Sequence, residues 1–196
     1  MTANTGESWN SIAKALHWAI AFLILFEVPV GFLMTYTYGP SLKDDHILKL
    51  HTFASQIHHT NGFLILTLVV FRLGWRYRHP APEMPVSLAR YEKALALLNH
   101  GFLYALLILF PLSGWCALSV FAESPLWLFG SDHIMPFILP KLPLTDTFGY
   151  GFFARIHRFC YQAGAGLLTL HIVAALWHHG IRKDNVLRRM WPLVGL

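Results

Sequence analysis

Charged residues are scarce in this chain. Only 13% of its 196 residues are Asp, Glu, Lys or Arg, whereas a soluble domain normally carries about 25%. Apolar residues make up 55% and aromatic residues 15%, and the mean hydropathy is positive. This composition argues against a water-soluble globular domain and indicates that lipid is the main solvent.

Cysteine is nearly absent as well. The two cysteines, Cys116 and Cys160, both fall within apolar stretches, and the sequence contains no CxxC pair. A disulfide framework or a cysteine zinc site is therefore not indicated, and the two residues are expected to be small core side chains. The sequence also lacks CxxCH, which excludes covalent attachment of haem through thioether bonds.

Four long apolar runs stand out, and each is close to the roughly twenty residues that a membrane-spanning helix needs. They cover residues 15–36, 58–77, 94–121 and 155–181. The first has no small-residue cleavage pattern, so we expect a retained helix rather than a removable signal. The sequence predicts an all-α fold, a transmembrane four-helix bundle, with residues 1–196 forming a single integral membrane domain.

The basic residues predict the orientation of this bundle. Four spans place both termini and the second loop on the same side, and ten of the fifteen Lys and Arg residues fall there. The positive-inside rule then predicts cytoplasmic termini. Basic residues next to a membrane attract anionic lipid headgroups, so the net charge of +5 requires no nucleic-acid partner.

Two histidines in the last apolar run are fourteen residues apart: His157 and His171. Fourteen steps of an α-helix turn about 1400°, within about 40° of four full turns, and rise roughly 21 Å. Both imidazoles therefore lie on the same helix face at two depths, one in each half of a hydrocarbon core about 30 Å thick. This spacing predicts two stacked haem sites.

Histidines near the starts of the first two runs supply partners at matching depths. His17 is expected near the cytoplasmic side and His58 near the outer side, so the predicted pairs are His17 with His171 and His58 with His157. Two imidazoles per iron leave no open position for oxygen, which is typical of a low-spin site for electron transfer.

Other interpretations of these histidines remain. His59 competes with His58, and His178 competes with His171, being seven residues further on the same face. A histidine inside the membrane can also serve as a simple interhelical hydrogen-bonding residue. Four further histidines are interpreted as loop or interface residues: His46, His51, His79 and His133.

Three residues lie at related positions on the same helix faces. Arg72, fourteen residues after His58, is expected at the depth of the inner haem, where it pairs with a haem propionate or else extends its charge toward the lipid headgroups. Gly31 and Gly164 are placed to leave room for the haems, although glycines also serve close helix packing.

Several segments resemble the bacterial-type cytochrome b561 family. These segments are LHW at His17, HHTNGFLILTLVVFR at His58 and Arg72, NHGFLYALLILFPLSGW, IHRF, and TLHIVAALWHHGIRKDNVLRRM. The resemblance covers nearly the whole chain and implies a four-helix cytochrome of the bacterial cytoplasmic membrane with two non-covalent haem b groups. The family's ligand positions correspond to His17, His58, His157 and His171. The loop over residues 123–150 departs from the family pattern.

The resemblance also implies a function. Family members exchange electrons with the membrane quinone pool, and one type is similar to a superoxide oxidase that passes electrons from superoxide to ubiquinone. Ubiquinone is therefore the expected substrate and superoxide a candidate donor. The candidates for quinone binding are His100, Tyr104 and Lys183, although the first two could equally form interhelical hydrogen bonds.

Two alternatives come from other functional classes. The first is a haem-bearing membrane anchor that relays electrons for a soluble periplasmic partner enzyme. The second is a histidine-rich metal transporter without haem, which would need acidic ligands along a polar pathway. The first apolar run offers only Glu27 for that role.

Overall fold

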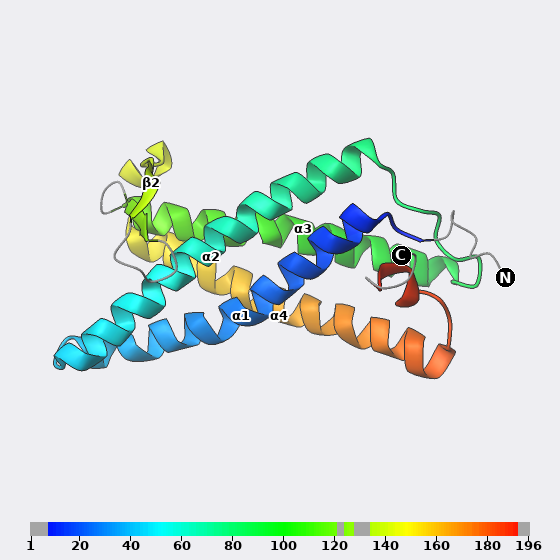
Figure 1. The fold of residues 1–196 in the computed structure, drawn as a ribbon, viewed down its shortest axis with the longest axis horizontal. Helices are drawn as coiled ribbons and strands as arrows, with labels where there is room; N and C mark the ends of the chain where they lie inside the picture. Colours follow the sequence, from blue (N-terminus) through cyan, green and yellow to red (C-terminus); the bar gives the residue numbers. More distant parts are fainter. Residues whose placement is uncertain (1–7, 121–123, 128–133, 192–196) are drawn as a thin grey trace.

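The computed structural model describes residues 8–120, 124–127 and 134–191. Four long helices dominate the described part of the chain (Figure 1). They are α1 (Ser11–Ser41), α2 (Asp45–Arg78), α3 (Arg90–Ser119) and α4 (Tyr150–Trp177), the last continued by the π-helical turn η2 (His178–Arg182). Each is long and apolar enough to cross a membrane, so the predicted four-helix transmembrane bundle is confirmed.

Helices α1 and α2 begin before the predicted apolar runs, each at a capping residue. The Asn10 side chain accepts a hydrogen bond from the Ala13 N–H at 2.8 Å and begins α1. Asp44 does the same for α2, accepting from the N–H groups of His46 and Ile47. Such caps satisfy backbone donors at a helix start. His46 and His51, predicted in loops or at interfaces, consequently lie within α2.

Smaller elements connect α3 and α4. The strands β1 (Ser124–Trp127) and β2 (Ile134–Leu139) pair antiparallel, and the 3₁₀ turn η1 (Pro143–Asp146) follows them. The indole N–H of Trp115 donates to the Pro140 carbonyl at 3.0 Å and ties this segment to α3. His133 and the predicted end of the third helix at residue 121 lie outside the described residues.

The arrangement gives the molecule two distinct ends (Figure 1). Both termini lie at one end, called the terminal end, while the α1–α2 turn and the β1–β2 strands lie at the other, called the hairpin end. Helix α1 packs mainly against α2, and α3 mainly against α4. Side chains must therefore bridge the interior between these two pairs of helices.

Two small clusters form the apolar core. Ile20, Ile65 and Val69 are buried between α1 and α2, and a second cluster around Cys116 and Phe153 joins α3 to α4 near the hairpin end. Most residues of the four spans are not buried within the chain itself. Large apolar side chains on the outer faces are thus available to contact lipid.

A C-terminal segment closes the terminal end. The 3₁₀ turn η3 (Arg188–Met190) lies against the start of α1. The backbone N–H of Trp9 donates to the Arg189 carbonyl at 3.3 Å, and the Trp18 indole donates to the Met190 carbonyl at 2.8 Å. The two ends of the described chain are therefore held together.

Candidate functional site

The structure brings the four predicted histidines together in two pairs across the bundle. The ring centres of His17 on α1 and His171 on α4 are 6.2 Å apart, with an interplanar angle of 77°. Those of His58 on α2 and His157 on α4 are 6.0 Å apart at 79°. Helix α4 contributes one histidine to each pair, so the fourteen-residue interval separates the two pairs along the bundle.

These separations fit one metal ion between the rings of each pair. A metal–imidazole bond is about 2 Å long, and the ring centre lies roughly 1.1 Å behind the nitrogen. Two axial imidazoles on one iron therefore have ring centres about 6.3 Å apart. Both observed distances are within a few tenths of an ångström of this value, so the donor set fits a haem iron coordinated by two histidines.

Two other histidines near these pairs, His59 and His100, fit less well. His59 is adjacent to His58 in α2, and neighbouring helical residues point about 100° apart, so the two rings cannot both face one iron. The His100 ring lies 5.1 Å from that of His171, closer than two axial ligands would be. The structure thus places His58 opposite His157 and leaves His100 beside the other pair.

At the hairpin end, hydrogen bonds orient the His157 ring. Its Nδ1 lies 3.0 Å from the Ser113 hydroxyl oxygen and 3.1 Å from the Phe110 carbonyl oxygen. The Ser113 hydroxyl itself donates to the Phe110 carbonyl at 2.6 Å, so its oxygen can accept from the imidazole. Because Nδ1 is engaged by neutral acceptors, Nε2 is the nitrogen left for a metal.

His58 has a different neighbour at its Nδ1. This nitrogen lies 2.6 Å from the Glu27 carboxylate oxygen Oε1, although the approach is not aligned as a hydrogen bond. The second oxygen, Oε2, accepts a 2.6 Å hydrogen bond from the side chain of Asn61, which is fully buried. Sequence analysis missed this role of Glu27. The signal was an acidic residue one helical turn before Gly31, on the face expected to meet the outer haem.

Two glycines make room for the hairpin-end histidines. A Cβ atom at Gly114 would lie 3.2 Å from Cε1 of His157, and one at Gly31 would lie 3.4 Å from Cε1 of His58. The contact at Gly114 is tighter than ordinary side-chain packing allows. A Cβ at Gly164 would meet Leu106 of α3 at an ordinary 3.9 Å, so the expected role of Gly164 beside both haems stays a prediction.

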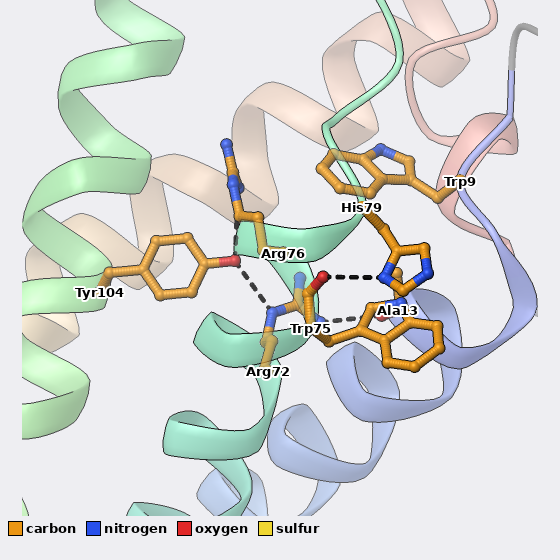
Figure 2. Close-up of a pocket in the computed structure, with 7 residues that line it drawn as sticks. All are labelled: Trp9, Ala13, Arg72, Trp75, Arg76, His79 and Tyr104. Carbon is orange, nitrogen blue, oxygen red and sulfur yellow. Dashed lines mark hydrogen bonds between the residues drawn. The ribbon is translucent and has the colours of Figure 1, made fainter.

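At the terminal end, Arg72 is held by groups from two other helices (Figure 2). Its Nε donates to the Tyr104 hydroxyl at 3.0 Å, and Nη1 donates to the Ala13 carbonyl at 2.9 Å. Arg76 also donates to the Tyr104 hydroxyl, at 3.3 Å, and lies over the Trp9 ring. Arg72 therefore does not simply extend toward the headgroups. It lines a small pocket together with Arg76, and the residues that line this pocket include no carboxylate.

The three predicted quinone-binding candidates make different contacts. Tyr104 faces the two arginines of α2, and the Nδ1 atom of His100 bonds to the Ala96 carbonyl of its own helix at 2.7 Å. Lys183 is exposed and has a left-handed backbone, with φ of 53°, directly after η2. The interhelical hydrogen bond expected as an alternative for Tyr104 is present, and it joins α3 to α2.

His178 belongs to the closing segment and not to the histidine pairs. Its Nδ1 lies 2.6 Å from the Asp184 carboxylate. Burial raises the pKa of Asp184, but hydrogen bonds from His178 and the Val186 N–H, together with the Arg182 charge, hold it below its usual value. This pair therefore anchors the segment after α4, which leaves His171 as the partner of His17.

A metal site made only of side chains is not seen in the described part of the chain. No group of three or more His, Cys, Asp or Glu side chains there is arranged to hold a metal ion. The two-histidine pairs are instead suited to a metal whose remaining ligands come from a macrocycle.

Comparisons with known proteins agree over almost the full length. A family model described as prokaryotic cytochrome b561 matches residues 8–193. Cytochrome b561 homolog 2 of Escherichia coli K12 is 29% identical over 188 residues, covering 95% of this chain and 93% of the relative. Homolog 1 of the same organism is 26% identical over 177 residues, covering 90% and 93%. A probable superoxide oxidase, CybB of Yersinia pestis, is 26% identical over 191 residues, covering 95% and 97%.

Proposed function

The chain belongs to the prokaryotic cytochrome b561 family, and from this premise we propose that it is a di-haem cytochrome that carries electrons across the membrane to or from the quinone pool. Family membership and the four apolar helices make it a multi-pass electron-transfer protein of the bacterial inner membrane that uses b-type haem. The proposal adds the haem number, the ligands and the substrate.

In this proposal, His17 and His171 bind one haem b, and His58 and His157 bind a second. The observation that carries it is the pair of ring separations, 6.2 and 6.0 Å, each suited to one iron. Bound haem supplies one-electron iron chemistry. With two imidazoles bound to each iron, no coordination position would stay open for oxygen, which favours electron transfer over oxygen binding.

The surrounding residues orient these ligands. The Ser113 hydroxyl and the Phe110 carbonyl hold the Nδ1 side of His157, while Gly31 and Gly114 allow the two hairpin-end rings to lie close to neighbouring helices. At the other end, the fixed guanidinium of Arg72 is available to a haem propionate through its remaining N–H donors.

We further propose superoxide as the electron donor and ubiquinone as the acceptor, since one relative is named a probable superoxide oxidase. Two superoxide anions each lose one electron and become dioxygen, and ubiquinone takes up the two electrons with two protons to become ubiquinol. With cytoplasmic termini, the hairpin end faces the periplasm. Lys43, Arg155 and Arg158 lie near that end and attract anions, an attraction that Asp44 and Asp45 at the start of α2 partly offset.

The first test is haem content. Haem per polypeptide and reduced-minus-oxidised spectra are measured on detergent-purified protein, then on His58→Ala and His171→Ala. Two haems b in the wild type are expected, with each substitution removing a different one. His46→Ala is the matched control, because His46 is exposed in the first turn of α2 and should leave both haems in place. No haem, or one haem insensitive to both changes, would reject the proposal.

The second test concerns the substrates. Purified holoprotein is supplied with enzymatically generated superoxide and a water-soluble ubiquinone analogue, and ubiquinol formation is followed. Formation that depends on both histidine pairs supports superoxide:ubiquinone oxidoreduction. If the haems pass electrons from dithionite to quinone but not from superoxide, the donor is wrong and a soluble periplasmic redox partner becomes the alternative.

A further inference from the structure

The two histidine pairs sit in opposite electrostatic surroundings. A buried carboxylate, Glu27, contacts His58 at the hairpin end, whereas Arg72 and Arg76 lie beside the terminal end. We infer that Glu27 is a positioning residue for His58 and that it holds the hairpin-end haem at a lower reduction potential than the terminal-end haem. This inference rests on the proposed di-haem function and adds a direction to it.

Glu27 is placed well inside a membrane-spanning helix. Its side chain is 14% exposed and that of His58 16% exposed, and Oε2 is held by Asn61, whose own exposure is 0%. An unpaired carboxylate in such surroundings is costly. Within the described residues no Lys or Arg is ion-paired with Glu27. His58 is therefore the group that balances this carboxylate.

A carboxylate at Nδ1 changes what the imidazole does at Nε2. The negative charge of Glu27, 2.6 Å from this nitrogen, makes the ring a stronger electron donor toward iron without requiring an aligned hydrogen bond. Stronger donation and a nearby negative charge both stabilise ferric over ferrous iron, which lowers the reduction potential. Among the described residues, Nδ1 of the second proposed ligand, His157, meets the neutral acceptors Ser113 and Phe110, so the effect comes through His58.

In the part of the chain that the structure describes, the terminal-end pair lacks such a carboxylate. Within the described residues no acidic side chain is ion-paired with His17 or His171. Arg72 instead binds the carbonyl of Ala13, one helical turn before His17 (Figure 2). A positive charge at this position favours the ferrous state and raises the potential. Both charges therefore favour electron movement from the hairpin end to the terminal end.

Redox titration of the purified holoprotein tests this ordering. Glu27→Gln keeps the size of the side chain and removes its charge. We expect the lower of the two wild-type midpoint potentials to rise in this variant while the higher one stays in place. A parallel change is expected in the ferric low-spin electron paramagnetic resonance signal of the hairpin-end haem, since the donor strength of His58 changes. The same titration in a His171→Ala background, which retains only the hairpin-end haem, assigns the shifted component.

Two further variants separate this role from general charge or folding effects. Asp146→Asn removes the same charge from an exposed residue at the hairpin end that is paired with Lys141 and not with a histidine. Neither midpoint potential should shift in this variant by as much as the lower potential shifts in Glu27→Gln. Glu27→Asp keeps the charge on a shorter side chain and should restore part of the low potential. If Glu27→Gln loses the hairpin-end haem while Glu27→Asp keeps it at low potential, the positioning role stands.

Three outcomes would overturn the inference: unchanged potentials in Glu27→Gln, equal shifts in Glu27→Gln and Asp146→Asn, or loss of the hairpin-end haem from both Glu27 variants. The haem content of the wild type separates these outcomes from failure of the proposed function. A wild type with fewer than two haems rejects that function, whereas two haems with potentials insensitive to Glu27 reject only the ordering.

Discussion

The hairpin-end and terminal-end histidine pairs share nearly the same geometry and differ in what surrounds them. Ring separations of 6.0 and 6.2 Å and interplanar angles of 79° and 77° are almost equal. At the hairpin end, however, the Glu27 carboxylate lies close to Nδ1 of His58 and the Ser113 hydroxyl is hydrogen-bonded to Nδ1 of His157. At the terminal end a third histidine, His100, lies beside His171. We therefore expect the spacing of the two histidines to set coordination at each site and their different neighbours to set its reduction potential.

The largest expected effect comes from breaking one pair at a time. His17→Ala and His157→Ala should each remove one of two haems, and the double variant His17→Ala/His171→Ala should lose no more than either single change, because both ligands serve one iron. By contrast, His17→Ala/His157→Ala should bind no haem. The number of haems that each purified variant retains is measured by the pyridine haemochrome method. If the His17/His171 double variant loses both haems, the assigned pairing is wrong.

A smaller effect is expected from crowding one pair. Gly114→Leu should displace His157, because even a Cβ atom would lie 3.2 Å from its ring, and overpacking of this kind commonly costs about 1–3 kcal/mol. The low-spin signal of the hairpin-end haem should weaken while the terminal-end signal stays. Gly101→Leu on the same helix is the control, since a Cβ there meets nothing within 4 Å. Equal loss of both signals would point to misfolding of α3 instead.

The smallest effect should come from the charge at the terminal end. Arg72→Gln should lower the potential of the terminal-end haem by about 60 mV or less, where 59 mV corresponds to a tenfold change in a one-electron equilibrium. Arg72→Lys keeps the charge and should shift the potential less, although it loses the bonds to Tyr104 and Ala13. Redox titration measures the potential of the terminal-end haem in both variants. A shift confined to the hairpin-end haem would contradict the comparison.

Much of the fold could be predicted from the sequence. Helix number follows from the lengths of the apolar runs, and the shared face of His157 and His171 follows from the regular turn of an α-helix. Helix ends were less predictable, because caps such as Asn10 and Asp44 lie outside the apolar runs. The short β1–β2 pair was not expected, since the sequence between α3 and α4 follows no membrane-spanning pattern.

The candidate site divides in the same way. Pairing of the four histidines was expected from their depth alone, and the structure brings both pairs together. The close approach of Gly114 to His157 and the contact between Glu27 and His58 were not expected. These details depend on how far one helix is rotated and shifted against its neighbour, which side-chain packing decides.

The sequence by itself determined that the chain spans a membrane four times and carries two histidine levels, because hydropathy and helical periodicity are local properties of the chain. Only the tertiary structure decided which groups surround each level. Glu27 on α1 lies against His58 on α2, and Tyr104 on α3 binds Arg72 on α2. The partners in these contacts are separated by 31 and 32 positions in the sequence, respectively. Such contacts form only after packing aligns the helices, so they do not follow from any local pattern.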